Sequence, residues 1–167
     1  MFHTEVILVD YQDKAVLRQL MEFYMYDFSE MEGLDVNAHG RFKYKYLDHY
    51  WTEDGRYPYF ILVDGKYAGF VLVKKRGVLN EDCFFIAEFF VMKKYRRNGV
   101  GHRAATQVFD RHRGAWEVGQ IKNNLVAHAF WRKVINQYTK GQFFETVVDD
   151  DRWHGPIQTF TNWKEAE

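Results

Sequence analysis

The chain has 167 residues, enough for one domain with a sizeable hydrophobic core and short for two. Lysine plus arginine equal aspartate plus glutamate, at 23 each, so no overall field recruits DNA, RNA or an anionic membrane. The single cysteine, Cys83, excludes an internal disulfide and fits a reducing compartment. With no long apolar segment or leader pattern, we expect a soluble cytoplasmic protein that binds neither nucleic acid nor membrane.

The first half of the chain alternates between strand and helix patterns. Apolar residues between Leu17 and Phe28 recur at helical spacing, and Asp64-Gly65 separates two apolar runs, which is typical of a β-hairpin. We therefore predict, in order, a strand at 6–9, a helix at 11–28 capped by Asp10 or Asp13, a short aromatic helix at 41–51, and two strands joined at Asp64-Gly65.

The second half continues the alternation. We predict a strand at about 82–92, a helix at 100–113, a short strand from near Trp116, a helix at 123–138, and a last antiparallel pair around a polar turn at 149–155. This order indicates an α+β fold in which helices cover the faces of a mixed sheet. Because no repeat or linker interrupts it, the sequence predicts a single domain over 1–167.

The segment "FFVMKKYRRNGVGHRAA", Phe89 to Ala105, joins an apolar strand to a helix through two glycines. Gly99 and Gly101 permit backbone conformations and close approaches that a Cβ would block, so N–H groups converge at the helix N-terminus. The helix dipole adds roughly half a positive charge there, which favours a bound phosphate. Cationic side chains that could pair with phosphate oxygens surround the turn: Arg96, Arg97, His102 and Arg103.

Three interpretations of this basic glycine turn compete. It is a structural turn with a solvated cationic surface, a site for a phosphate-bearing ligand, or a nucleic-acid-binding patch. The last is the weakest, since the cations are confined to one turn and the net charge is zero. The turn matches neither GxGxxG nor GxxxxGK[ST], so a phosphate site here would be a local pyrophosphate site.

The segment "VMKKYRRNGVG" resembles motif A of the GNAT N-acetyltransferase superfamily, a strand that leads into (Q/R)xxGx(G/A) at a helix start. Arg96, Gly99 and Gly101 occupy the three motif positions. Downstream, "NLVAHAFW" resembles motif B, N-x-x-A-x-x-(F/L)-(Y/W), beginning at Asn124. "YDFSE" and "HGRF" are similar to segments of bacterial members. The resemblance covers essentially the whole chain and implies a mostly antiparallel sheet of six to seven strands that splays after the fourth.

The resemblance also implies acetyl-CoA binding. The backbone N–H groups of 97–101, with His102, would hold the pyrophosphate, and the exposed edge of the strand at 90–92 would pair with the pantetheine arm. The helix that begins at Asn124 would flank the thiol end. The residues so implied are Phe90, Val91, Met92, Arg96, Arg97, Asn98, Gly99, Val100, Gly101, His102, Asn124, Ala127, Phe130 and Trp131.

Acetyl transfer to an amine needs three groups: a base that removes the amine proton, a hydrogen-bond donor to the thioester oxygen, and an acid that assists the departing thiolate. Glu88 lies in the middle of the apolar strand, on the face predicted for Phe90 and Met92, where burial would raise its pKa as a general base needs. The alternatives are a pairing with lysine or arginine and simple exposure to water. By analogy with the family, the donor would be the Val91 N–H.

The general acid is where the sequence departs from the family pattern. Many members place a tyrosine at the position of Trp131, and an indole N–H does not deliver a proton at neutral pH. Either the thiolate leaves without a dedicated acid or another phenol serves. Tyr138, two helical turns further along the same face, is the candidate substitute, although a purely structural role is common for such a tyrosine.

The resemblance places the acceptor pocket between the first two helices, the splayed strand and the last hairpin. Aromatic and acidic residues in these segments suit an amine through cation–π and charge contacts. The predicted acceptor contacts are Tyr26, Phe28, Glu30 and Tyr46, from segments that also hold Tyr24, Asp27, Phe42, Tyr44, Tyr50, Trp153 and His154. The histidines lack ligand spacing, so no metal site is predicted.

The resemblance implies an N-acetyltransferase that moves an acetyl group from acetyl-CoA to the amine of a small molecule or peptide. Direct transfer in a ternary complex is expected, because no nucleophile is positioned for a covalent intermediate. The alternatives are a non-catalytic acyl-CoA-binding or sensing module and a nucleic-acid-binding domain that uses the basic turn. A homodimer through the C-terminal strands would be common in the family, and the sequence does not identify the acceptor.

Overall fold

The computed structural model describes residues 1–163, so the last four residues of the predicted domain lie outside the described ones. The strands in this part of the chain form one sheet: β1 (Thr4–Leu8), β2 (Arg56–Val63), β3 (Lys66–Lys74), β4 (Phe84–Val91), β5 (Ala115–Gly119), β6 (Phe144–Asp150) and β7 (Trp153–Thr161). The helices are α1 (Lys14–Glu32), α2 (His49–Thr52), α3 (Val100–Arg111) and α4 (Leu125–Thr139), with short 3₁₀ turns η1 (Tyr11–Asp13) and η2 (Lys93–Tyr95).

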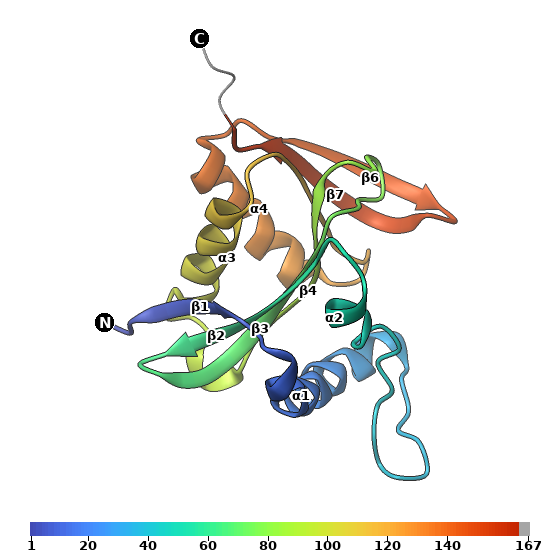
Figure 1. Ribbon diagram of the computed structural model, residues 1–167. Helices are drawn as coiled ribbons and strands as arrows, with labels where there is room; N and C mark the ends of the chain where they lie inside the picture. The colour runs from blue at the N-terminus through green and yellow to red at the C-terminus, as the bar shows by residue number, and fades with distance from the viewer. Residues whose placement is uncertain (164–167) are drawn as a thin grey trace.

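The sheet has the order β1-β2-β3-β4-β5-β7-β6, and its neighbouring strands are antiparallel except β4 with β5. α3 and α4 lie on one side of the sheet, and α1 with α2 lies on the other (Figure 1). β4 and β5 pair only at Phe84 with Trp116 and at Phe85 with Glu117. Beyond Phe85 the two strands separate, which confirms the predicted mostly antiparallel sheet with a splay after the fourth strand.

The central strands are buried on both faces. Val71 and Val73 of β3 belong to the core under α3 and α4, whereas Phe70 and Leu72 belong to the core under α1. This double burial explains why "YFILV" in β2 and "GFVLV" in β3 carry no charged residue. The two cores hold β4 from both sides, and β4 carries the candidate site.

Helix α1 differs from its predicted range at both ends. Its predicted first turn is the 3₁₀ turn η1, and neither Asp10 nor Asp13 makes a side-chain capping hydrogen bond, so the predicted caps were wrong. The helix continues one turn beyond its predicted end to Glu32. Gly33 then ends it in the left-handed conformation, at φ 62°.

The aromatic helix predicted at 41–51 was wrong over most of its length. Only His49–Thr52 is helical, and the chain before it consists of irregular structure and turns. Phe42, Tyr44 and Tyr46 recur at every second position, a spacing that suits an extended chain and not a helix. The segment uses this conformation to carry the Tyr44 hydroxyl to β4.

The C-terminal hairpin is tighter than predicted. β6 and β7 pair from Phe144 with Thr159 to Asp150 with Trp153, so the predicted polar turn at 149–155 shrinks to two residues. β6 forms the edge of the sheet and is mostly exposed.

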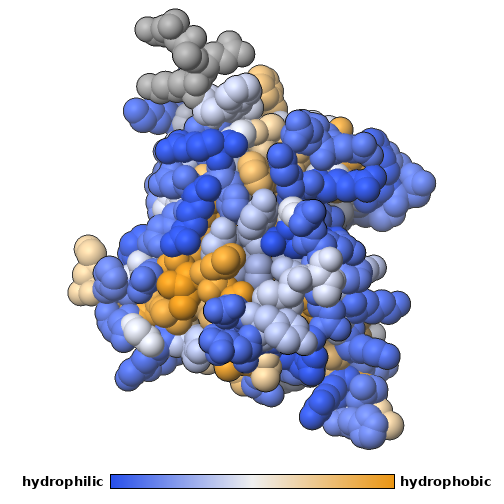
Figure 2. Space-filling view, in the orientation of Figure 1, coloured by the Kyte–Doolittle hydropathy of each residue, from blue (hydrophilic) through white to orange (hydrophobic). Residues whose placement is uncertain are grey.

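The surface is mostly polar on the face drawn in Figure 2, with one hydrophobic patch in the region of β1 and β2. Leu8, at the end of β1, is among the exposed large apolar residues. Within residues 1–163, no helix combines the length and the apolar character that crossing a membrane requires.

A buried histidine links the end of α3 to the sheet. The Nε2 of His112 lies 2.7 Å from the Tyr59 hydroxyl, and its ring packs against Tyr57 and Phe84. Burial lowers the pKa of His112 from 6.5 to about 4, because the charged imidazolium would lose its hydration.

We expect the stability that His112 contributes to be lost as the pH falls from about 6.5 to about 4. In this range the unfolded imidazole binds a proton and the folded one does not, which favours unfolding by up to about 3 kcal/mol. The unfolding free energies of wild type and His112→Phe, measured by denaturation at several pH values, test this. The contributions of other titrating groups cancel in the difference between the two proteins. A difference that stays constant across this range would contradict a buried neutral imidazole.

Candidate active site

Glu88 is positioned by a β-bulge in β4. Leu72 of β3 pairs with Glu88, whereas the next residue, Val73, pairs with Ile86, so Ala87 is an extra residue without a partner. In a regular strand Glu88 would share a face with Ile86, which packs under α3 and α4. The bulge shifts the alternation and turns the carboxylate toward α1.

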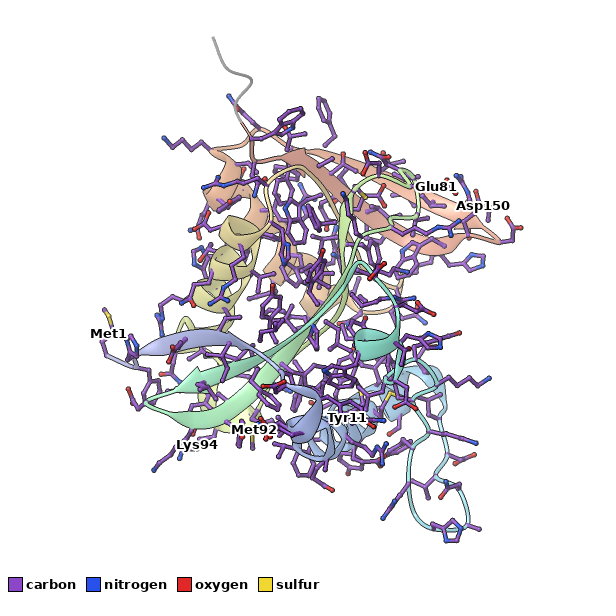
Figure 3. The ribbon with its side chains drawn as sticks, in the orientation of Figure 1. Met1, Tyr11, Glu81, Met92, Lys94 and Asp150 are labelled. Carbon is purple, nitrogen blue, oxygen red and sulfur yellow. The ribbon has the colours of Figure 1, made fainter. Side chains whose placement is uncertain are left out.

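Before the bulge even-numbered residues of β4, such as Ile86, face α3 and α4, whereas after it even-numbered residues face α1. Glu81, shortly before β4, and Met92, directly after it, lie at opposite sides of the molecule in Figure 3, and the strand between them crosses the interior. Glu88 and Phe90 share a face, as predicted, and the structure turns this face toward α1. Phe89 lies with Ile86 on the opposite face, under α3 and α4.

Two tyrosine hydroxyls bind the Glu88 carboxylate. The hydroxyl of Tyr24, on α1, donates to Oε2, and that of Tyr44 donates to Oε1 at 3.2 Å. Burial raises the pKa of Glu88 from 4.5 to about 7, and the two hydrogen bonds offset part of this effect. The carboxylate thus changes protonation near neutral pH.

The tyrosines around Glu88 remain protonated donors. Burial and the nearby carboxylate raise the pKa of Tyr24 and of Tyr44 well above 10, and the pKa of Tyr50 rises to about 12. The Arg56 guanidinium lies 5.5 Å from the centre of the Tyr50 ring. The phenols therefore orient the carboxylate and do not compete with it for protons at neutral pH.

Glu88 lines a cavity of about 680 Å³ that reaches both faces of the sheet. The opening exists because β4 and β5 are separated beyond Phe85. The wall on the side of α1 includes Tyr24, Met25, Phe28, Glu32, Tyr44, Tyr46, Tyr50, Arg56 and Lys74. The wall on the side of β5 and α4 includes Phe89, Gly119, Gln120, Asn124, Ala127, Trp131 and Trp153. Within residues 1–163, no group of three or more acidic, histidine or cysteine side chains is arranged to hold a metal ion.

The glycine turn before α3 leaves several N–H groups without helical partners. The first hydrogen bond of this helix end runs from the Arg103 N–H to the Gly99 carbonyl, so the N–H groups before it point out of the helix N-terminus. Arg97 and Gly99 both have positive φ, at 62° and 73°, which curls the backbone into a concave anion-binding turn. The Nε2 of His102 is buried and has no partner among the described residues.

Two arginines brace the turn from within the protein. Arg103 donates to Thr4 Oγ1 at 3.1 Å and to the Asn98 carbonyl at 3.0 Å. Arg96 donates to the Val91 carbonyl at 2.7 Å and also pairs with Asp27 of α1. The Arg96 side chain thus ties β4 to α1, and its contact with phosphate stays a prediction.

The Val91 N–H points toward the splay. The Met92 N–H donates to the Ala68 carbonyl of β3 at 2.8 Å, and neighbouring backbone groups of a strand alternate in direction. Val91 therefore directs its own N–H and carbonyl to the opposite edge, where Arg96 binds the carbonyl. This geometry suits the donor role predicted for the N–H.

The motif B residues lie on the other wall of the splay. The Asn124 side chain caps α4 by accepting from the Ala127 N–H at 3.1 Å, and both residues line the cavity with Trp131. Phe130 packs against Phe89, with 5.6 Å between ring centres. A Cβ built on Gly101 would lie 3.1 Å from the Phe130 ring, so this glycine permits the contact between the glycine turn and α4.

Some predicted site residues lie away from the cavity. Tyr26 and Glu30 are exposed on α1 and do not line it, because their neighbours Tyr24 and Phe28 take the inward helical face. Tyr46 does line it, as predicted. Arg56 and Lys74 line the cavity and were not predicted. In the sequence each is marked only as a cation at one end of an apolar strand.

Tyr138 is also separated from the cavity. Its hydroxyl donates to Asp110 of α3 at 2.8 Å and accepts from Asn162 at 3.2 Å, and its ring packs on Phe109 and Phe160. These contacts give it the structural role and correct its assignment as a general acid. We expect Tyr138→Phe to lower the unfolding free energy by about 1 kcal/mol and to leave any acetyl-transfer kcat within roughly twofold. A thermal scan and steady-state kinetics check both; a kcat loss above tenfold would contradict the assignment.

A family model described as "Acetyltransferase (GNAT) family" matches residues 14–135, which include both glycines of the turn, Glu88 and the first two thirds of α4. The chain belongs to the GNAT acetyltransferase family. The family motifs account for the glycine turn and for the helix that begins after Asn124. No curated protein matches the chain.

Solved structures share this GNAT fold at low sequence identity. An acetyltransferase from Thermus thermophilus has a TM-score of 0.69 at 13% identity and covers 95% of this chain and 97% of its own. The ribosomal-protein-S18-alanine N-acetyltransferase from Escherichia coli has a TM-score of 0.61 at 12% identity, with 99% and 97% covered. The PaiA N-acetyltransferase from Thermoplasma acidophilum, in complex with coenzyme A, has a TM-score of 0.62 at 11% identity, with 96% and 99% covered. These likenesses show the fold.

Proposed function

We propose that this GNAT protein transfers an acetyl group from acetyl-CoA to an amine of a small molecule or peptide, directly in a ternary complex. The observation that carries the proposal is the position of Glu88. Its carboxylate is half-buried at the splay, has its pKa raised to about 7, and faces a cavity that joins both sides of the sheet. An amine that enters from the α1 side could meet a thioester that enters from the α4 side only at this point.

The residues present fit coenzyme A. The unpaired N–H groups at the start of α3, the buried Nε2 of His102 and the close approach at Gly101 form a cradle for a pyrophosphate. The open edge at Val91, beside Phe90, would align the pantetheine arm. The pairing predicted for Met92 is corrected, because its N–H binds the Ala68 carbonyl and its carbonyl accepts from the Tyr95 N–H. Asn124, Ala127, Phe130 and Trp131 would flank the thiol end. Acetyl-CoA would supply the acetyl group as an activated thioester.

Glu88 would act as the general base. An acceptor amine is mostly an ammonium ion at neutral pH and attacks only after it loses a proton. A carboxylate with a pKa near 7 accepts that proton, directly or through water, more readily than an exposed glutamate does. Tyr24 and Tyr44 hold its two oxygens in place.

The Val91 N–H would stabilise the negative charge that develops on the carbonyl oxygen during attack. Its direction into the splay supports this role. We propose no general acid: Trp131 cannot supply a proton, and Tyr138 lies outside the cavity.

Release of CoA thiol with a panel of small amines and peptides tests the proposal. We expect turnover with at least one class of amine, and kcat/KM that rises with pH through an apparent pKa near 7. Tight acetyl-CoA binding without turnover for any amine would favour the sensing module. Salt-dependent nucleic-acid binding without acetyl-CoA binding would favour the basic turn as a nucleic-acid patch.

A further inference from the structure

Two cations face each other across the β2–β3 hairpin inside the acceptor half of the cavity. Arg56, the first residue of β2, is the direct cross-strand partner of Lys74, the last residue of β3. Both side chains line the cavity that holds Glu88. Like charges directly opposite each other in a sheet are destabilising, so this pair is an unusual feature of a wall built mostly from aromatic residues.

No carboxylate in the described chain forms an ion pair with Lys74. Its Nζ has no carboxylate oxygen within 4.0 Å among residues 1–163, and its nearest recorded contact is the Phe85 ring, at 5.0 Å from the ring centre. Burial first, and Arg56 next, lower the pKa of Lys74, which reflects the cost of holding an ammonium ion there, and the more distant Glu88 offsets part of this effect. Arg56 forms an ion pair with Glu53, an exposed residue, at 3.1 Å.

Glu88 does not serve as the counter-ion of Lys74. The oxygens of its carboxylate are bound by Tyr24 and Tyr44, and no ion pair with Lys74 is formed. Leu72, the strand partner of Glu88, lies two residues before Lys74 and therefore on the same face of the sheet. Two strand residues span about 7 Å, so the carboxylate and the cation pair lie within reach of one small molecule.

Building on the proposed function, we propose that the acceptor is a zwitterion: an amine directed at Glu88 that also carries a carboxylate bound between Lys74 and Arg56. A carboxylate placed there would relieve the repulsion between the two cations and receive hydrogen bonds from both. The aromatic walls formed by Phe28, Tyr46 and Tyr50 would cover the body of the molecule. Free amino acids are the chemical class that combines these features.

Matched pairs of amines, with and without a carboxylate, test this specificity. We would measure kcat/KM for CoA release with three such pairs: L-phenylalanine and phenethylamine, L-lysine and cadaverine, and γ-aminobutyrate and propylamine. A fourth pair, phosphoethanolamine and ethanolamine, differs by a phosphate in place of the carboxylate. The carboxylated member of at least one pair is expected to be preferred by roughly tenfold or more, chiefly through KM, because only that member can receive charge-assisted hydrogen bonds from Lys74 and Arg56. In Lys74→Met this preference should fall toward one, and Lys74→Arg should retain most of it.

The preference is the ratio of two kcat/KM values measured on the same protein sample. Partial unfolding of a variant lowers both values equally and leaves the ratio unchanged. Lys75→Met is the control, because the next lysine points to the other face and does not line the cavity, and its ratio should match wild type. Equal or better turnover of the decarboxylated amines overturns the zwitterion and leaves the acetyltransferase intact. A preference confined to phosphoethanolamine also overturns it, in favour of a phosphate. Acetyl-CoA binding with no turnover of any amine would overturn the proposed function itself.

Discussion

Replacing Glu88 with glutamine is expected to lower the acetyl-transfer rate by roughly 10²–10⁴-fold and, at the same time, to stabilise the protein above pH 7. Glutamine keeps the shape of the side chain and can still contact the Tyr24 and Tyr44 hydroxyls, but it cannot accept the amine proton. The expected loss is therefore in kcat and in the pH dependence of kcat/KM. The rise through an apparent pKa near 7 should disappear in the variant.

The gain in stability follows from the direction of the pKa shift. The pKa of Glu88 is raised from 4.5 in the unfolded chain to about 7 in the folded protein, so folded Glu88 holds its proton where unfolded Glu88 has lost it. The contribution of Glu88 to stability is therefore highest below about pH 4.5 and falls as the pH rises to about 7, by about 3 kcal/mol in total. Glutamine has no such loss, so Glu88→Gln should unfold roughly 5–10 °C higher than wild type at pH 8, with a smaller gain at pH 5.

Glu117→Gln is the matched control for this experiment. Glu117 is a second buried carboxylate, but it accepts backbone N–H groups from Val78, Leu79 and Asn80 and so holds the β3–β4 loop. Its replacement should destabilise the protein, because an amide NH₂ cannot accept these bonds. A Glu88→Gln variant with wild-type kcat, or one destabilised like Glu117→Gln, would contradict the role of Glu88.

Gly69→Ala is expected to destabilise the protein by about 3 kcal/mol or more, a fall in Tm of roughly 10 °C. A Cβ on Gly69 would lie 1.9 Å from the Phe90 carbonyl oxygen and 3.1 Å from the Val91 Cα. Both atoms belong to the backbone of β4, so no side-chain rotation relieves the clash. The pairing of β3 with β4 must therefore shift next to Val91, whose N–H is the proposed donor to the thioester oxygen. Activity should fall together with stability.

Gly33→Ala separates this steric effect from the general effect of losing a glycine. Gly33 has a left-handed φ of 62°, and a Cβ there would meet nothing within 4 Å. Its replacement should cost only about 1 kcal/mol and leave activity unchanged. Thermal unfolding of both variants measures the difference. Equal falls in Tm would show that the close approach of Gly69 to β4 does not add to the destabilisation.

The sequence predicted the fold well because its strongest signals were local. The Asp64-Gly65 turn, the apolar runs of β2 and β3 and the glycine turn before α3 each determine their own structure. The segment at 41–51 failed for a related reason: its aromatic residues satisfy long-range contacts with α1 and β4, and no local pattern encodes such contacts.

The glycine turn and the start of α4 could be predicted from the sequence, whereas the α1 side of the cavity was less predictable. Motif residues such as Gly99, Gly101 and Asn124 sit where a local pattern requires them. The bulge at Ala87, which sets the direction of Glu88, depends on the register between β3 and β4 and leaves no mark in the sequence. The facing of Arg56 and Lys74 likewise depends on hairpin register, so only the structure brings them together.

Calorimetric titration with acetyl-CoA tests the proposed cofactor site most directly. The titration compares wild type with Gly101→Val and uses ATP as the comparison ligand. Gly40→Ala is the control variant, because a Cβ on this glycine would meet nothing within 4 Å. We predict one saturable site for acetyl-CoA in wild type and in Gly40→Ala, weak or no binding of ATP, and loss of the acetyl-CoA site in Gly101→Val, whose side chain would press on Phe130. At a hundred times its Kd, the ligand should stabilise wild type by about 2.7 kcal/mol. No heat and no thermal shift with acetyl-CoA in the wild-type protein would contradict the proposed acetyltransferase.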